Sequence, residues 1–190
     1  MTKQLFPFLT LLSLIALTLV VGCKKDEFKN VLNYDGDNNG APELANGIYV
    51  AAARFPASVT AEFEGRQLEA VEFYLRNVPA STEILIFDEG TANSPGSILS
   101  SANVSALVTP DSWYRHELAF PVDIKASDLW IGVRVDHPET FASVGCDPGP
   151  AVSNGDLMLV NNGSEWTTLR NFTNGEVDIN WNIRGFVREE

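Results

Sequence analysis

The chain has 190 residues and a formal net charge of −12 at pH 7, from 25 acidic and 13 basic residues. So acidic a surface repels nucleic acid and anionic lipid headgroups, which excludes nucleic acid as an expected partner. A hydrophobic content of 45% excludes a disordered chain, and the length suits one domain with a sizeable core.

Residues 1–22 have the pattern of an export signal. Lys3 precedes an uncharged apolar run over residues 5–21, and small Gly22 and then Cys23 follow. The N-terminal position, the cationic flank and the small-residue exit favour a secretory signal over an uncleaved anchor helix. The tetrad VVGC at 20–23 resembles the lipobox of bacterial lipoproteins. The resemblance implies cleavage before Cys23 and a lipid on its thiol, which would anchor the protein to a membrane; an ordinary signal peptide with an incidental cysteine is the alternative.

The residues after the predicted anchor carry a second signal. Residues 24–27 read KKDE, so cations are followed by two acids. This pattern resembles the surface-export signal of Bacteroidota lipoproteins and implies an outer-membrane protein that faces the cell exterior. A solvated charged tether is the alternative. We therefore expect a lipidated tether over 23–27 and a single domain over 28–190.

Nine segments read as β-strands in chain order. Strict alternation of apolar and polar residues is strongest in VEFYLRN, LWIGVRVDH and VDINWNIRGFV, as expected for strands with one face in the core and one in water. The predicted strands are 28–34, 47–55, 71–77, 82–88, 97–105, 113–120, 129–137, 156–160 and 177–187. Only 56–65 looks briefly helical. This order predicts an all-β, antiparallel two-sheet β-sandwich, jelly-roll-like, with one short helical piece.

Three motifs carry a family resemblance. LWIG at 129–132, DPGPAV at 147–152 and NWNIRGFV at 180–187 occur in that order. Together with the surrounding strands, over roughly 33–187, they resemble the β-sandwich modules of Bacteroidota surface and secreted proteins, and more loosely the cleaved-adhesin domains of gingipains and haemagglutinins. The resemblance implies a jelly roll with binding or adhesive duties, with a glycan or a host or surface protein as ligand.

Motifs of catalysis are absent from the sequence. It contains no G-x-S-x-G, no H-E-x-x-H and no Cys-x-x-Cys pair, and no glycine-rich loop for phosphate. After lipidation Cys146 is the only thiol left, and no motif ties it to His116 or His137, so we expect a buried small hydrophobe rather than a nucleophile. We therefore expect no enzyme. Among 25 acids a carboxylate pair is inevitable, which leaves a glycoside hydrolase as a weaker alternative.

Carbohydrate binding is the stronger alternative, as in a lipoprotein of a glycan-uptake system. Aromatic rings on a sandwich can stack on a pyranose while amides and carboxylates take its hydroxyls. Trp181 shares a face with Ile179 and Ile183 and is expected in the core. Trp166 follows a turn in NGSEWTTL and is the best candidate for an exposed ligand-binding ring.

Two polar features have both a ligand-binding and a structural interpretation. Asp147 either supplies an oxygen ligand or caps the turn into Pro148. The polar row Asp178, Asn180, Asn182 and Arg184 is either a ligand surface or the wet side of a sheet, and the second is favoured.

The hexapeptide DGDNNG at 35–40 raises the question of calcium. Asp35, Asp37 and Asn39 match positions 1, 3 and 5 of an oxygen-donor loop, with Gly40 at position 6. The twelfth position is Asn46 instead of a bidentate Glu, which excludes an EF-hand. A looser calcium site is one interpretation, and a polar turn between two strands is the favoured one.

Overall fold

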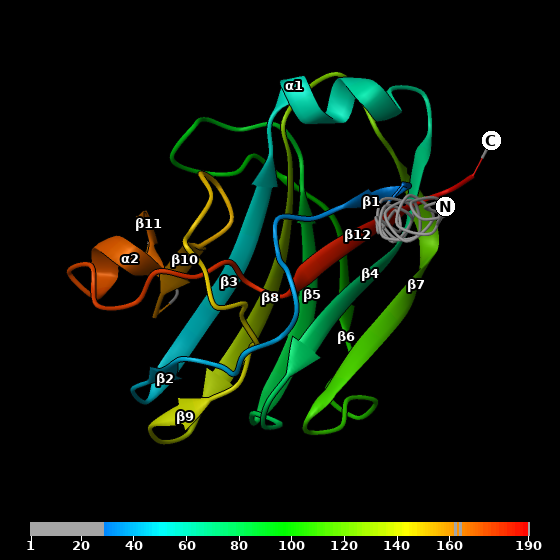
Figure 1. Cartoon of the computed structure of the whole chain (residues 1–190). Helices are drawn as coiled ribbons and strands as arrows, with labels where there is room; N and C mark the ends of the chain where they lie inside the picture. Colours follow the sequence, from blue (N-terminus) through cyan, green and yellow to red (C-terminus); the bar gives the residue numbers. More distant parts are fainter. Residues whose placement is uncertain (1–28, 162, 164, 190) are drawn as a thin grey trace, which may run out of the picture.

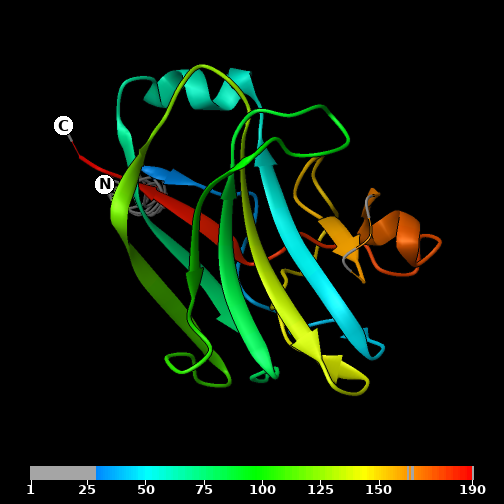
Figure 2. The ribbon, with the colours of Figure 1, turned by 180° about the vertical axis from the view of Figure 1, so that it is seen from behind.

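Two antiparallel β-sheets face each other across one apolar layer (Figures 1 and 2). The computed structural model describes residues 29–189 except 162 and 164, so the predicted signal peptide, Cys23 and the tether lie outside the described residues. The four-stranded sheet has the order β1 (Val31–Leu32), β12 (Ile183–Val187), β4 (Gln67–Leu75) and β7 (Ser112–Asp123). The six-stranded sheet has the order β11 (Trp166–Thr168), β10 (Leu157–Val160), β3 (Gly47–Phe55), β8 (Leu129–His137), β5 (Ser81–Phe87) and β6 (Ile98–Asn103).

The strand order is that of a jelly roll. The chain crosses between the sheets from β3 to β4 and from β4 to β5, and again from β6 to β7 and from β7 to β8. Every pairing within the two sheets is antiparallel. The predicted all-β, antiparallel two-sheet sandwich with jelly-roll-like order is therefore confirmed.

Alternation along the strands builds the core, as predicted. Val71, Phe73 and Leu75 of β4 are fully buried between the sheets. Ile131 and Val133 of β8 face them from the other sheet and are fully buried too. Burial of such side chains, at about 25 cal/mol per Å² of apolar surface, is the main favourable term for a domain whose described part holds no disulfide.

A second apolar cluster covers the outer side of the six-stranded sheet. Its buried members are Val50, Ala52, Leu85, Phe87, Trp130 and Leu157, with Leu159 and Trp166 packed against them. These residues alternate in sequence with the core residues of the same strands, so both faces of this sheet are covered. The four-stranded sheet, in contrast, turns polar side chains outward.

Short elements account for the differences from the predicted list. The predicted helical piece at 56–65 is present as α1 (Ala57–Thr60) followed by a 3-10 turn, η1 (Ala61–Phe63). The small sheet of β2 (Glu43–Leu44) and β9 (Phe141–Ala142), the strand β11 and the helix α2 (Leu169–Phe172) were not predicted. Elements of two to four residues are too short to show a period. Within the described part of the chain, no helix is long and apolar enough to span a membrane.

Candidate binding site

The outward face of β4 supplies the first side chains of the candidate site. Because Phe73 and Leu75 point into the core, the residues between and beyond them, Tyr74 and Arg76, point away from it. Tyr74 lies opposite Trp113 of β7, and the two rings meet edge to face with centroids 5.7 Å apart. A half-exposed aromatic pair therefore stands on the polar side of the sandwich.

An open depression of about 680 Å³ lies beside this pair, where the end of β4 meets β2, β9 and the segment after Tyr34. We call it the Tyr74 depression. Small residues line part of it (Gly40, Ala41 and Ala142), and its polar and aromatic lining is Asn38, Asn39, Glu43, Tyr74, Arg76 and Asn77. Uncharged amides and one aromatic ring dominate the lining, and Glu43 is its one carboxylate among the described residues.

The segment 143–146 holds the two walls of the depression together. The backbone N–H of Gly145 donates to the carbonyl of Tyr74 (2.9 Å), and that of Cys146 donates to the carbonyl of Gly40 (2.9 Å). A Cβ at Gly145 would lie 2.7 Å from the Tyr74 ring and 2.9 Å from the Asn38 amide nitrogen. Only glycine allows so close an approach at this position, so residue 145 fixes how closely Asn38 and Tyr74 approach each other.

Arg184 of β12 ties the wall at 35–40 to the sheet. Its Nη2 lies 2.8 Å from Oδ2 of Asp35 and its Nε 3.0 Å from the same oxygen, while Nη1 lies 3.6 Å from Oε2 of Glu72. Its guanidinium also stacks over the Trp113 ring, 3.9 Å from the centroid. Asn182 adds a hydrogen bond from Nδ2 to Oδ2 of Asp35 (2.8 Å). The Asp35 carboxylate is thus fully buried and bound by protein donors.

The predicted calcium ligands are therefore not brought together as a loop of convergent oxygens. Asp35 points inward to Arg184, whereas Asp37 and Asn39 are exposed. Among the described residues, no group of three or more His, Cys, Asp or Glu side chains is placed to hold a metal ion. Calcium binding at Asp35, Asp37 and Asn39 stays a prediction, and the geometry gives Asp35 a structural role.

Asp147 also serves the fold. Its Oδ1 accepts hydrogen bonds from the backbone N–H groups of Gly149 (2.9 Å) and Asn180 (2.8 Å), and its Oδ2 accepts from Nδ2 of Asn180 (2.9 Å). The bond to Gly149, two residues on, is the turn cap that was one of the two interpretations of Asp147. The polar row 178–184 is not the wet side of a sheet, because Asn180 and Asn182 are buried and bind these loops. That expectation was wrong.

Trp166, the predicted ligand-binding ring, lies on the other sheet. It is half-buried and packs edge to face on Trp130 (5.4 Å between centroids) and Phe87 (6.1 Å). Trp181 is buried in the core, as expected. Trp166 and the Tyr74 depression belong to different sheets and form two separate places where an aromatic ring reaches the surface.

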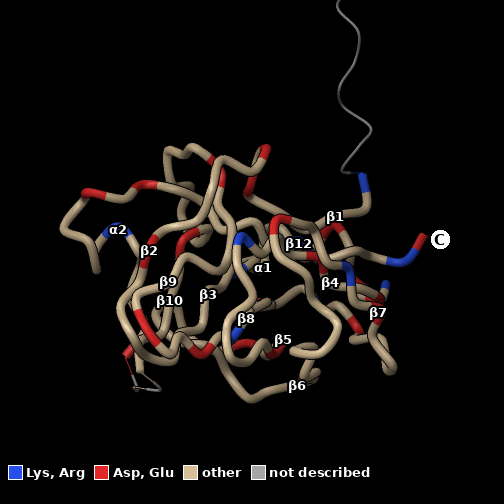
Figure 3. Tube along the Cα trace, turned by 90° about the horizontal axis from the view of Figure 1, so that it is seen from below, with Lys and Arg blue, Asp and Glu red and all other residues tan. Residues whose placement is uncertain are grey.

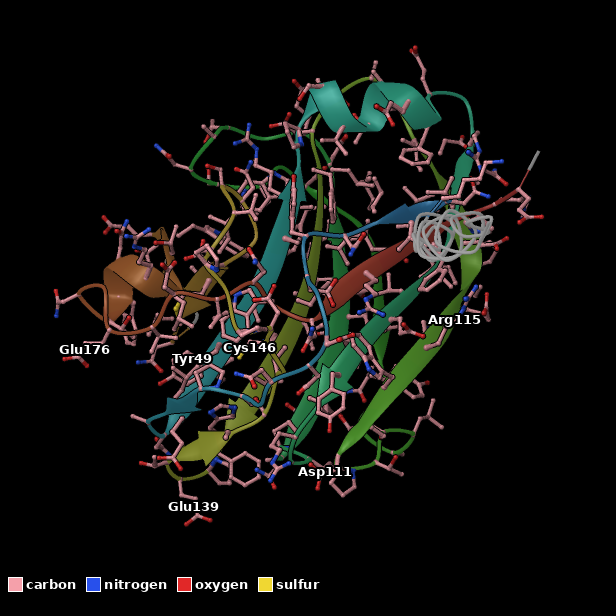
Figure 4. All side chains as sticks on the ribbon, in the orientation of Figure 1. Tyr49, Asp111, Arg115, Glu139, Cys146 and Glu176 are labelled. Atoms are coloured by element: carbon pink, nitrogen blue, oxygen red, sulfur yellow. The ribbon has the colours of Figure 1, made fainter. Side chains whose placement is uncertain are left out.

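Cys146 is a buried thiol, labelled in Figure 4. Burial, and next the negative charge of Asp147, raise its pKa to about 11, so it is protonated at neutral pH. The two histidines have contacts elsewhere: Nε2 of His137 lies 2.7 Å from Oγ of buried Ser143, and the His116 ring lies against Tyr114. The geometry fits the predicted small hydrophobe.

The strand order places the chain in the class of all-β jelly-roll sandwiches. No protein-family model matches it, and no curated protein matches it significantly. The resemblance to Bacteroidota surface modules therefore stays a prediction.

The solved chains that share the fold include two from Cwp84. One is described as the clostridial cysteine protease Cwp84 after propeptide cleavage (TM-score 0.57, 13% identity, 86% of this chain and 41% of that one). The other holds the cysteine protease and lectin-like domains of Cwp84, a surface layer associated protein of Clostridium difficile (TM-score 0.53, 13% identity, 83% of this chain and 37% of that one). The chain thus spans about two fifths of each neighbour, and the likeness shows the fold alone.

These neighbours correct one expectation. The sequence led us to expect no enzyme, but both matched chains carry the name of a cysteine protease. The absence of catalytic motifs is therefore not sufficient to exclude catalysis for a chain with this fold, and the exclusion is withdrawn. A likeness at 13% identity shows a shared fold and does not assign the protease activity of these neighbours to this chain.

The residues of the Tyr74 depression were missed as a site by sequence reasoning. The alternation in VEFYLRN does turn Tyr74 and Arg76 outward, which is a usable signal for one part of the lining. Another part comes from Asn38 and Asn39, which reach the same place through Cys146, more than 100 residues later in the chain. No local pattern reports such a contact.

Proposed function

We propose that the protein is an outer-membrane lipoprotein, anchored through Cys23 and facing the cell exterior, whose β-sandwich binds glycans in the Tyr74 depression. The VVGC tetrad and the KKDE tether support the anchor and its outward orientation. The observation that carries the binding role is the depression itself, where an aromatic ring lies among the amides of Asn38, Asn39 and Asn77. A ring for the apolar face of a pyranose and amides for its hydroxyls are the groups that sugar recognition requires.

Two further points support a glycan as ligand. The depression is open and its walls are polar. Such a site suits a segment of a long glycan chain better than a small apolar molecule. One of the two structural neighbours contains a lectin-like domain. Its identity to this chain is 13%, so the comparison supports a glycan as ligand only as part of this proposal.

The test is a glycan-array screen of the full chain in detergent, followed by calorimetry with the best ligand. We expect Tyr74→Ala to weaken binding about tenfold, because the stacking ring is lost. Phe172→Ala is the matched control, since Phe172 is an exposed ring on α2, in a different part of the chain, and its loss should leave binding unchanged. Both variants should unfold at the wild-type temperature within about 2 °C if the fold is intact.

Absence of any glycan ligand would contradict the proposal. Loss of binding with Trp166→Ala but not with Tyr74→Ala would move the site to the other sheet, where Trp166 packs on Trp130.

Adhesion to a protein is the second candidate, and one observation favours it. Phe120 on β7 is 85% exposed, and Ile98 and Leu99 on β6 are exposed as well. Both strands are sheet edges, which offer unpaired backbone groups to a partner strand. A screen against host and surface proteins, with Phe120→Ser as the variant, tests this role separately from glycan binding.

A further inference from the structure

The charged side chains in and around the Tyr74 depression indicate which chemical class of glycan it would bind. Among the residues that the structure describes, Arg76 is the only cation in the lining, and its guanidinium Nη1 lies 2.7 Å from Oδ1 of Asp111. Asp111, labelled in Figure 4, is also held by its backbone, whose N–H donates to the carbonyl of Arg76 (3.1 Å). A negative charge is therefore fixed beside Arg76, even though an exposed ion pair contributes little to stability by itself.

The guanidinium of Arg184, which stacks on the Trp113 ring beside Tyr74, has partners within the protein as well. Arg184 is paired with the buried carboxylate of Asp35 and with Glu72, and its flat side is taken by the Trp113 ring. Its side chain is only 13% exposed, so an anion in the depression would gain little from it.

The remaining charges near the depression are negative. Glu43 lines it, Asp37 is exposed in the adjoining loop, and the whole chain carries a net charge of −12. Figure 3 shows the acidic residues spread over many elements and few cations between them. An anionic ligand would meet repulsion over a wide approach.

Uncharged groups are what the depression offers a ligand. Within the described part of the chain, the Tyr74 hydroxyl and the side-chain amide of Asn39 make no hydrogen bond to the protein, and both residues lie in the lining. Asn77 donates to the carbonyl of Ala142 (2.8 Å) through Nδ2, which leaves its amide oxygen as an acceptor. Hydroxyl groups satisfy such a mixture of donors and acceptors without any charge.

We infer that the Tyr74 depression binds neutral, hydroxyl-rich oligosaccharides and discriminates against glycans that carry uronate, sialate or sulfate groups. The inference rests on the proposed function, because it names the chemical class of glycan for the same site. Its physical basis is that Asp111 pairs with the lining cation Arg76, while the Tyr74 hydroxyl, the Asn39 side-chain amide and the Asn77 amide oxygen are left to bind a ligand.

A matched ligand pair tests the inference. The probes are a neutral hexose oligosaccharide that binds on the array and the same oligosaccharide oxidised at C6 to the uronate. With the full chain in detergent at low salt, we expect the uronate to bind at least about tenfold more weakly, with the difference shrinking as salt screens the repulsion.

Asp111→Asn is the diagnostic variant. Asp111 adopts a left-handed backbone conformation (φ 51°), which asparagine tolerates, so the change removes the charge and keeps the turn. It leaves Arg76 uncompensated, and we expect uronate binding to rise several-fold while binding of the neutral oligosaccharide stays at the wild-type level. Glu139→Gln, an exposed acid that does not line the depression, is the control and should change neither.

The outcomes separate the two claims. Tighter binding of the uronate than of the neutral oligosaccharide by the wild type would overturn the inference and leave glycan binding in place. An equal rise in the affinity for both ligands in the Asp111→Asn variant would overturn the inference too. If neither class binds, the proposed function fails together with the inference.

Discussion

Two acidic residues that look like ligands in the sequence hold loops in the structure. Both oxygens of Asp35 accept hydrogen bonds from Arg184. Oδ1 of Asp147 accepts from the backbone N–H groups of Gly149 and Asn180, and its Oδ2 accepts from the Asn180 side chain and the backbone N–H of Gly36. A buried carboxylate must be compensated in this way, since the cost of an uncompensated buried charge is several kcal/mol. Residue type alone does not reveal whether the compensating donor is a protein group or a ligand.

His137 makes stability depend on pH. Burial lowers its pKa below the usual value of 6.5, so the folded protein keeps the ring neutral where the unfolded chain protonates it. The contribution of His137 is fully present above pH 6.5 and is lost as pH falls through 6.5 toward the lower folded pKa. We expect the melting temperature to fall between pH 7.5 and 5.5.

His137→Asn should flatten that fall, measured as melting temperature against pH, although it lowers the temperature itself by removing the bond to Ser143. Asp156 acts in the opposite sense, because burial raises its pKa and its contribution is lost as pH rises above 3.8. Asp156 therefore cannot explain a loss of stability on acidification, and an unchanged slope in His137→Asn would contradict the assignment.

At the scale of elements, alternation predicted the long strands. The prediction failed where the backbone bonds to side chains or loops instead of to a neighbouring strand. The predicted strand 177–187 is a strand only from Ile183. Before it, the N–H of Asn180 goes to the Asp147 carboxylate and the N–H of Trp181 to the carbonyl of Gly155. The outward side of β4 in the candidate site was predictable for the same reason as the core. The loop that faces it was not, because its partner segment is distant in sequence.

Segment 143–146 provides the prediction at this scale. Gly145→Ala places a methyl group 2.7 Å from the Tyr74 ring, which must push 143–146 away from β4. We expect a loss of about 1–3 kcal/mol in the free energy of unfolding, from urea denaturation, together with weaker glycan binding.

Gly36→Ala is the matched control from the facing loop. A Cβ there meets nothing within 4 Å, and the residue has no left-handed φ. Stability and binding should both stay at the wild-type level. Equal effects of the two variants would show that the close approach at Gly145 does not position Tyr74.

At the scale of the whole molecule, the sequence predicted the class and layers of the fold well, because repeated alternation of apolar and polar residues leaves few architectures for one domain. The sequence also predicts a membrane location, and the residues behind that prediction lie outside the described part of the chain. Cys23→Ser should remove the lipid anchor and release the protein into the soluble fraction, measured by membrane fractionation. Wild-type-like retention in the membrane would contradict the lipoprotein proposal, and Cys146→Ser, which leaves the tetrad intact, is the control.

The register of the four-stranded sheet places the start of β1 and the Tyr74 depression toward opposite ends of β4. The chain enters the sheet at Val31, opposite Phe186, which in turn lies opposite Ala70 (Figure 1). Tyr74 lies four residues further along β4 and Arg76, one residue past the end of the strand, lies six residues further, so they are separated from Ala70 by roughly 13–20 Å. If the protein is anchored through Cys23 and binds glycans as we propose, the sandwich acts as a spacer that presents the depression away from the point of attachment. A long polysaccharide can cross the far end of the domain while its unbound parts remain in the medium, so capture does not require the polymer to approach the lipid headgroups.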